Sequence, residues 1–353
     1  MNPKHILLIK SHSMGIGDLL RSSAAWQVLK ARWPAAQLHL LMLSRHPGYP
    51  TEQLIREHHL LATASFVSVA ARPDSPEKRS STEIRNDVRK ALCEVPIDLV
   101  IDCEPYGLRT TFLARWIARN WSAQTVGVGQ FPTRGWWYGL AAPSTRAYVE
   151  KHQLPEPMDY TERDFVALAA LGLERQGTPI VLNVSADGLT WQRQHLPAGE
   201  HARRVTLNIG CGTSDALPKR PAMQDLVANM VALYQAMPFA LHLSGASFER
   251  DVNAEFAQAF EQRLSALGSY CVVTDWAGQC SLSQLTGLLG ASDLVISTDS
   301  GPYHMAVGLG VPTVCWFNFE TPASYHRQRG AQMVINPSTT EFVGAVRASL
   351  GVA

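Results

Sequence analysis

The sequence predicts an α/β protein built from two consecutive doubly wound parallel sheets. Apolar runs of strand length alternate with amphipathic stretches of helix length, which is typical of βαβ units. This rhythm breaks in the middle of the chain and then restarts. The length of 353 residues fits about two domains of ordinary size.

The first half contains five expected strands, each followed by a helix or a turn. Each strand is a short and nearly continuous apolar run, as expected for a parallel strand buried on both faces. The strands cover residues 5–10, 37–43, 65–70, 97–102 and 125–129. The helices cover residues 18–33, 51–61, 82–93 and 108–119.

The centre of the chain has a different character. Residues 131–160 are rich in aromatics and proline, and a helix is expected over residues 160–171. Residues 174–203 look irregular and contain several glycines and prolines, which favour loops. We therefore expect a first domain over residues 1–175 and a linker over residues 176–203.

The βα rhythm then resumes in a second domain, expected over residues 204–337. Its strands cover residues 204–210, 239–245, 270–274, 293–298 and 312–317. Its helices cover residues 223–236, 249–267 and 282–290, with a short one from Pro302. A C-terminal helix is expected within residues 338–353. In doubly wound sheets a ligand sits outside the carboxyl ends of the strands, which here predicts a central cleft between the two domains.

Composition excludes several classes of protein. A hydrophobic content of 46% supports a folded core, and 31 Lys+Arg against 30 Asp+Glu argues against bulk nucleic-acid binding. No apolar run approaches the ~20 residues that span a bilayer, and residues 6–9 are too short for a secretory signal. Six cysteines without a CxxC pattern indicate a reducing compartment. We expect a cytoplasmic protein.

A first motif follows the first strand, where Gly15-Ile16-Gly17-Asp18 leads into a helix. Glycines at such a turn admit a ligand, and the helix start favours negative charge. The pattern fails as a dinucleotide fingerprint because position 20 is leucine. Arg45, after the second strand, leaves an NADP-dependent oxidoreductase as an alternative. For Asp18 the alternative role is a helix-capping carboxylate.

A second motif is Ser297-Thr298-Asp299-Ser300-Gly301-Pro302-Tyr303-His304, between a strand and a helix. Its hydroxyls and amides at a helix start suit an anion such as a diphosphate. His304 lies about one turn into the helix and can donate to the same anion. Taken alone, it would be interpreted as a core histidine.

A third motif follows the first strand of the second half. It runs through Gly210, Thr213 and Ser214 to Lys219-Arg220-Pro221. Hydroxyls and a lysine that face the same crevice would neutralise phosphate. The alternative for Lys219 is a solvated loop charge.

These three motifs, in this order, resemble glycosyltransferase family 9, the ADP-heptose:lipopolysaccharide heptosyltransferases. HILLIKSHSMGIGDLL is similar to the family's first motif, and DLVISTDSGPYHMAVGLGVPTVCWF is similar to its C-terminal signature. The resemblance covers most of the chain. It implies two Rossmann-like domains facing a central cleft, the glycosyltransferase B architecture.

The resemblance also implies residue roles. Asp18 looks like the general base that takes the proton from the acceptor hydroxyl. Lys219 looks like the lysine that contacts the donor diphosphate, with Thr213 and Ser214 as further phosphate donors. The remaining donor-binding residues are Asp299 for sugar hydroxyls, Ser300, Gly301 and His304 for the diphosphate, and Glu249 for the ribose. For Glu249 a helix N-terminal carboxylate is an equal alternative.

The expected reaction is an inverting, metal-independent transfer of a sugar, with heptose from ADP-heptose as the leading donor. No Asp-x-Asp occurs in the chain, so no cofactor and no metal are expected. The acceptor is a glycan, a glycolipid such as the lipopolysaccharide core, a protein or a small metabolite. A non-catalytic sugar-nucleotide-binding module is a further alternative.

The acceptor is expected on the first domain. Residues 134–138, RGWWY, with Arg115, Arg119 and Arg146 near them in sequence, suit an anionic glycolipid or a membrane interface. Peripheral association with the inner face of the cytoplasmic membrane follows as an expectation. A packed loop between the domains is the alternative for residues 134–138.

Overall fold

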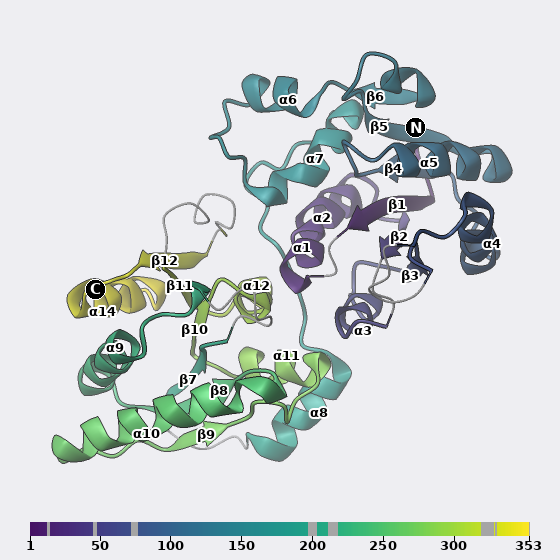
Figure 1. Ribbon diagram of the computed structural model, residues 1–353. Coiled ribbons are helices and arrows are strands. Elements are labelled where there is room, and N and C mark those ends of the chain that lie inside the picture. The colour runs from purple at the N-terminus through teal and green to yellow at the C-terminus, as the bar shows by residue number, and fades with distance from the viewer. Residues whose placement is uncertain are drawn as a thin grey trace. The chain divides into compact units, whose positions relative to one another are not determined.

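The computed structural model divides the chain into two compact units, Met1–Ile180 and Val181–Ala353. It describes residues 1–12, 15–44, 48–71, 77–196, 203–210, 218–318, 328 and 330–352. Each unit contains one sheet of six strands with helices packed on it (Figure 1). The predicted α/β class with two Rossmann-like sheets is confirmed.

Unit 1 holds the sheet β3-β2-β1-β4-β5-β6, in which every neighbouring pair is parallel. Its strands are β1 (His5–His12), β2 (Gln37–Ser44), β3 (Thr63–Ser68), β4 (Leu99–Asp102), β5 (Gln124–Val128) and β6 (Leu140–Ala142). Its α-helices are α1 (Ile16–Leu20), α2 (Ser22–Arg32), α3 (Thr51–Arg56), α4 (Ser81–Leu92), α5 (Leu108–Trp121), α6 (Thr145–Lys151) and α7 (Arg163–Leu168). Three 3₁₀ turns complete the unit: η1 (Arg134–Trp137), η2 (Tyr160–Glu162) and η3 (Ala169–Leu171).

Unit 2 holds the sheet β12-β11-β10-β7-β8-β9, again with parallel neighbours throughout. Its strands are β7 (Arg203–Asn208), β8 (Phe239–Ser244), β9 (Val273–Asp275), β10 (Leu294–Thr298), β11 (Thr313–Phe317) and β12 (Ala331–Ile335). Its helices are α8 (Ala186–His195), α9 (Met223–Ala236), η5 (Ser247–Glu249), α10 (Arg250–Ala266), α11 (Leu282–Gly290), α12 (Gly301–Gly308) and α14 (Thr339–Ser349).

The two sheets share one topology. In chain order each reads 3-2-1-4-5-6, so the strand order reverses between β1 and β4 in unit 1 and between β7 and β10 in unit 2. Ligands of doubly wound sheets bind at the carboxyl ends of the strands at such a reversal. The motifs that follow β1, β7 and β10 therefore lie at the expected binding edge of their own sheet.

Each sheet is covered by helices that bury alternate strand residues. In unit 1, α4 and α5 pack on the face that Leu7 and Ile9 share. In unit 2, α9, α10 and α14 pack on the face that Val205 and Leu207 share. Buried side chains of this kind are the main source of stability for each unit.

Within the described residues the structure adds five elements that the sequence pattern did not predict, namely β6, η1, α6, α8 and β12. The segment expected as a linker contains α8, which packs tightly on α11: a Cβ atom on Gly287 would lie 2.1 Å from the Gly188 carbonyl oxygen. Ser185 caps the start of α8 and donates from its hydroxyl to Ser283. Residues 186–195 are thus a structural part of unit 2, and the expected linker is wrong over this stretch.

Two expected helices also differ in detail. The helix expected over residues 18–33 is divided at Arg21, although the backbone of Arg21 keeps helical angles. The helix expected over residues 160–171 is a short α-helix, α7, between the 3₁₀ turns η2 and η3. No helix in the described part of the chain is long and apolar enough to cross a membrane.

Candidate active site

Unit 1 has a pocket of about 240 Å³ at the carboxyl ends of its central strands. It is lined by Lys10, Ser11, Asp18, Leu19, Arg21, Ser22, Met42, Glu104, Tyr160, Arg163 and Asp164. β1, β2, β4, α1, α2 and α7 all contribute to this lining or lie directly beside it. The pocket contains Asp18, the residue expected to act as the base.

Asp18 is placed so that it can act on a ligand. Its side chain is 44% exposed, and a carboxylate oxygen accepts from Arg21 at 3.1 Å. Gly15, the residue before the helix, has no side chain with which to cap it, and Asp18 lies in the first turn. A carboxylate there is favoured by the helix dipole. Arg21 is buried and lies 5.3 Å from the centre of the Tyr160 ring. Its ion pair therefore holds the Asp18 carboxylate at the lining of the pocket, beside Tyr160.

Two further ion pairs line the same pocket. Lys10 donates to Asp164 at 2.5 Å, and both side chains are nearly buried. Burial disfavours the Lys10 ammonium, but the negative charges of Asp164 and Glu104 outweigh that effect and raise the pKa of Lys10. Arg163 lies 3.8 Å from Glu104. The pocket therefore presents fixed charges of both signs.

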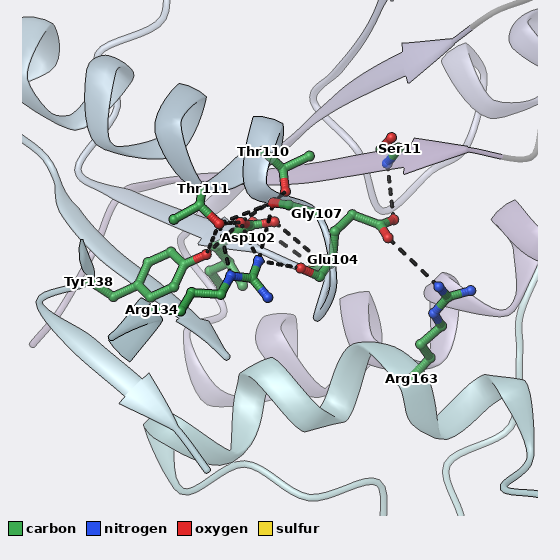
Figure 2. Close-up of polar contacts among 11 residues, drawn as sticks. Ser11, Asp102, Glu104, Gly107, Thr110, Thr111, Arg134, Tyr138 and Arg163 are labelled. Carbon is green, nitrogen blue, oxygen red and sulfur yellow. Dashed lines mark hydrogen bonds and ion pairs between the residues drawn. The ribbon is translucent and has the colours of Figure 1, made fainter. Parts of the chain in front are cut away.

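A buried polar cluster supports the strand ends next to the pocket. Figure 2 shows Arg134, Tyr138 and Thr111 converging on Asp102, at the end of β4. Asp102 accepts from Tyr138 at 2.6 Å and lies 3.3 Å from Arg134. Burial raises the pKa of Asp102 to about 6, although these donors oppose the shift. Burial and the nearby Asp102 also raise the pKa of Tyr138.

The cluster fixes the turn that carries Glu104. The backbone N–H of Glu104 donates to Asp102 at 3.1 Å, and Arg134 donates to the Glu104 carbonyl at 2.6 Å. The Glu104 side chain in turn accepts from the Ser11 N–H at 3.0 Å (Figure 2). Asp102 and Arg134 are therefore positioning residues for the end of β1, which precedes the Asp18 motif in the chain.

In unit 2, Lys219 and His304 meet at Asp299. The Lys219 ammonium lies 2.7 Å from one carboxylate oxygen of Asp299, and His304 Nε2 lies 4.0 Å from the other. Asp299 and His304 are almost fully buried, whereas the Lys219 side chain is 31% exposed. The structure thus brings together three residues predicted from two motifs 80 residues apart. Lys219 is therefore not a solvated loop charge.

The turn before α12 is held by polar contacts to β7. Thr298 donates to the Gly210 carbonyl at 2.6 Å, and Asn208 donates to Ser300 at 3.0 Å. α12 begins at Gly301, with proline in its first turn, and no side chain caps it. The start of a helix is the end that favours an anion. Ser300 and Gly301 therefore lie where the prediction placed them, at the start of a helix beside β7.

Glu249 lies at the same edge of the sheet and is 3% exposed. One carboxylate oxygen accepts from the Ala246 N–H at 2.8 Å, and another lies 3.6 Å from Arg220. A Cβ atom on Gly210 would collide with this carboxylate, so any larger residue there would displace the Glu249 side chain. Glu249 therefore performs the local capping role that the sequence left open, at a position directly next to the third motif.

Some predicted residues lie elsewhere. Thr213 and Ser214, like Arg45 of the NADP alternative, lie outside the described residues. Arg134 and Tyr138, expected among acceptor contacts, are buried in the cluster around Asp102. Trp136 and Trp137 are 80% and 39% exposed. Part of residues 134–138 is therefore packed within unit 1 and part is exposed, and a loop packed between the domains stays a prediction.

Sequence reasoning missed several residues of these sites. In unit 1 they are Lys10, Arg21, Glu104, Arg163 and Asp164, and in unit 2 the main one is Asn208. Lys10, Glu104 and Asn208 follow or end buried apolar strands, at positions where a polar side chain is costly unless it is paired. That pattern was available in the sequence as a signal.

Comparisons with known proteins identify the class. The model of glycosyltransferase family 9 (heptosyltransferase) matches residues 86–341. The chain belongs to glycosyltransferase family 9, a family of enzymes that transfer sugars. The resemblance read from the three motifs is thereby confirmed, and the match decides against the NADP-dependent oxidoreductase.

The matches to individual proteins are either short or low in sequence identity. A stretch of 49 residues is 43% identical to the lipopolysaccharide core heptosyltransferase OpsX of Haemophilus influenzae, which covers 14% of each chain. The fold is similar to a glycosyltransferase family 9 structure from Veillonella parvula, with a TM-score of 0.71, 16% identity and coverage of 99% and 97%. It is also similar to E. coli ADP-heptose lipopolysaccharide heptosyltransferase II, with a TM-score of 0.66, 17% identity and coverage of 98% of each chain. These structural matches establish the fold.

Proposed function

We propose that the protein transfers heptose from ADP-heptose to a sugar hydroxyl of a lipopolysaccharide core. The observation that carries the proposal is the convergence of Lys219, His304 and the start of α12 at the strand reversal of unit 2, in a chain of this family. A cation and the start of a helix at one edge suit a diphosphate. The relatives named as heptosyltransferases support the choice of sugar.

The donor is held by unit 2 in this proposal. The diphosphate accepts from the backbone N–H of Gly301 at the start of α12, and Lys219 turns from Asp299 toward the phosphates. His304 donates to the same anion when protonated. The Asp299 and Glu249 carboxylates accept hydrogen bonds from hydroxyl groups of the donor's sugars. Thr213 and Ser214 supply further donors to phosphate. The roles of the described residues follow from the chemistry of each side chain and its place at the carboxyl edge of the sheet. Those of Thr213 and Ser214 follow from the resemblance of the third motif to the family.

Asp18 acts as the general base on the acceptor. Its carboxylate takes the proton of the acceptor hydroxyl as the oxygen attacks the anomeric carbon of heptose. The bond from that carbon to the diphosphate breaks, and ADP leaves with the electron pair. A single displacement of this kind inverts the anomeric configuration. Fixed donors at the diphosphate stabilise the leaving charge, so the proposed reaction needs no metal.

The acceptor class follows from the same pocket. Three ion pairs surround about 240 Å³ beside Asp18, which suits a polar and charged sugar rather than an apolar ligand. A protein side chain or a small metabolite as acceptor, or another nucleotide sugar as donor, would use the same base and diphosphate site with different contacts. Because lipopolysaccharide is built on a lipid, we place the enzyme at the inner face of the cytoplasmic membrane as a peripheral protein.

A transfer assay tests the proposal. The protein is incubated with ADP-heptose and a lipopolysaccharide acceptor that lacks the heptose, with and without a chelator, and the product is analysed by mass spectrometry and NMR. The expected result is addition of one heptose with inverted configuration at an equal rate in both samples. Retained configuration, or loss of turnover with the chelator that added divalent metal restores, would contradict the mechanism. No transfer from ADP-heptose to any such acceptor would contradict the function.

A further inference from the structure

One helical face of unit 1 is exposed, aromatic and basic. α5 places Leu108, Phe112, Arg115 and Arg119 at spacings of four, three and four residues, which puts them on one side of the helix. Leu108 and Phe112 are 56% and 46% exposed, whereas the opposite side of α5 packs into the core of the unit. An exposed stripe of this kind needs an explanation that core packing does not supply.

The turn η1 extends this stripe. Trp137 packs edge-on against Phe112 at 5.1 Å, and Arg115 lies 4.9 Å from the centre of the Trp137 ring. Trp136, beside it in the chain, is 80% exposed. We call Leu108, Phe112, Arg115, Arg119, Trp136 and Trp137 the α5 surface.

The charge of this region has one sign. Residues 105–149 contain five arginines and no aspartate, glutamate or lysine, in a chain whose overall net charge is only +1. Arg134 pairs with Asp102 in the buried cluster, and Arg146 pairs with Glu150. The α5 surface continues toward α4, where Arg85 and Arg89 lie over the Trp116 ring at 5.8 Å and 5.4 Å. Two acids on α4, Glu83 and Asp87, are bonded to Ser80 and Arg79.

We infer that the α5 surface docks on a bilayer of anionic lipids. Tryptophan and phenylalanine enter the boundary between headgroups and acyl chains, and arginines beside them pair with anionic headgroups. A surface with both properties matches such a membrane in polarity and in charge. The inference rests on the proposed function in one respect: an acceptor built on a lipid has to be met at the membrane.

Vesicle co-sedimentation tests the inference. The full chain is mixed with vesicles that contain phosphatidylglycerol, or with vesicles of phosphatidylcholine alone, and the bound fraction is measured. We expect binding to the anionic vesicles. Raising the salt from about 0.1 M to about 1 M shortens the screening length from roughly 10 Å to roughly 3 Å and should release most of the protein.

Matched variants locate the surface. The double variant Trp136→Ser with Arg119→Ser should lower the partition coefficient by about tenfold or more. The control Tyr270→Ser with Arg347→Ser removes a similarly exposed aromatic, 77% against 80%, and an exposed arginine from unit 2, and should bind like the wild type. The single variants Trp136→Ser and Arg119→Ser are measured as well, because the double variant can be interpreted only if it is folded at the assay temperature.

The outcomes separate the surface from the function. Equal vesicle binding by wild type and double variant, or no binding by the wild type, would overturn the inference. So would a wild type that self-associates through Trp136 without binding vesicles. Calorimetry with ADP is run on the same proteins. A protein that binds vesicles but not ADP would contradict the proposed function and leave the α5 surface standing, and the reverse result would do the opposite.

Discussion

Unit 1 and unit 2 share one strand order but place different kinds of side chain at the point where that order reverses. At the reversal in unit 1, charged side chains of both signs surround a pocket and are paired with one another, as in Lys10–Asp164 and Arg21–Asp18. At the reversal in unit 2, hydroxyls, an amide and glycines form the strand ends, and Lys219 reaches in to Asp299. The fold supplies an edge, and the residues placed on it decide what the edge can bind.

The difference suggests a division of labour. In the proposed mechanism the base is a carboxylate that touches the acceptor, and Asp18 of unit 1 is the residue proposed for this role. A leaving diphosphate needs donors and positive charge, and unit 2 presents both at the start of α12. Substitutions in the two units should therefore change different measured quantities.

The largest expected effect is on turnover through Asp18. Asp18→Asn should reduce the transfer rate by at least ~10²-fold, because the base is lost, while ADP affinity stays within about twofold. Stability should change by less than about 1 kcal/mol, since the ion pair with Arg21 is partly exposed. Transfer kinetics, calorimetry and a melting curve measure the three quantities.

Asp87→Asn is the matched control, because Asp87 is 47% exposed and paired with Arg79 in the same unit. It should leave all three quantities unchanged. Near-normal turnover of Asp18→Asn would remove Asp18 from the mechanism, and Asp299 would then be the next carboxylate to substitute.

Lys219 should dominate donor binding. It is the only lysine in residues 181–353, and its ammonium lies 2.7 Å from Asp299. Lys219→Ala should weaken ADP binding by ~1.5–3 kcal/mol, which is roughly tenfold to 150-fold, and should also slow turnover. Calorimetry on Lys219→Ala and on the exposed control Lys151→Ala measures the difference. Equal ADP affinity in wild type and Lys219→Ala would transfer the role to Arg220.

The buried cluster of unit 1 should make stability depend on pH. The pKa of Asp102 is about 6 in the folded chain, above its value of ~3.9 in an unfolded one. The folded state therefore holds this proton more tightly, so its contribution to stability is present below about pH 4 and is lost as pH rises through 6. The loss amounts to at most ~3 kcal/mol.

Denaturant unfolding of wild type and Asp102→Asn between about pH 4 and pH 7 measures this contribution. The stability of the wild type should fall relative to that of the variant as pH rises across this window. Parallel curves would show that Asp102 is ionised in both states. Asp87→Asn serves again as the control, and its curve should run parallel to that of the wild type.

The α8–α11 contact should be intolerant of a methyl group. In Gly287→Ala the new Cβ atom would lie 2.1 Å from the Gly188 carbonyl oxygen, so one of the helices has to shift. We expect a loss of ~1–3 kcal/mol in the unfolding free energy. Gly344→Ala, on an open face of α14, should instead add up to ~1 kcal/mol. Equal melting temperatures for these two variants would contradict the packing described for α8.

The sequence predicted the frame of both units because their strands are apolar and buried on both faces. β6 and β12 escaped prediction, since β6 has only three residues and the short apolar run of β12 is interrupted by Gln332. α8 escaped because Gly188 and its neighbours look like a loop, whereas the packing on α11 is what requires that glycine. Arg21 divides a predicted helix without leaving helical angles, which no pattern of side chains reveals.

The candidate sites were predictable where one motif carries the chemistry and were not where contacts cross the sheet. Asp299, Ser300, Gly301 and His304 lie within six residues of sequence. The link from Ser11 to Glu104 spans 93 residues, and that from Asn208 to Ser300 spans 92. Such links form only when the parallel strands are brought together, so spacing along the chain could not predict them.

Calorimetry with nucleoside diphosphates tests the central claim most directly, namely that unit 2 is a donor site for an ADP-sugar. ADP, GDP and UDP are titrated into the wild type, Asp18→Asn and Lys219→Ala. We predict that ADP binds most tightly, that Asp18→Asn binds it like the wild type, and that Lys219→Ala binds it at least tenfold more weakly. Tight binding of GDP or UDP with no binding of ADP would contradict the ADP-heptose donor, and ADP binding that depends on Asp18 but not on Lys219 would contradict the division between the two units.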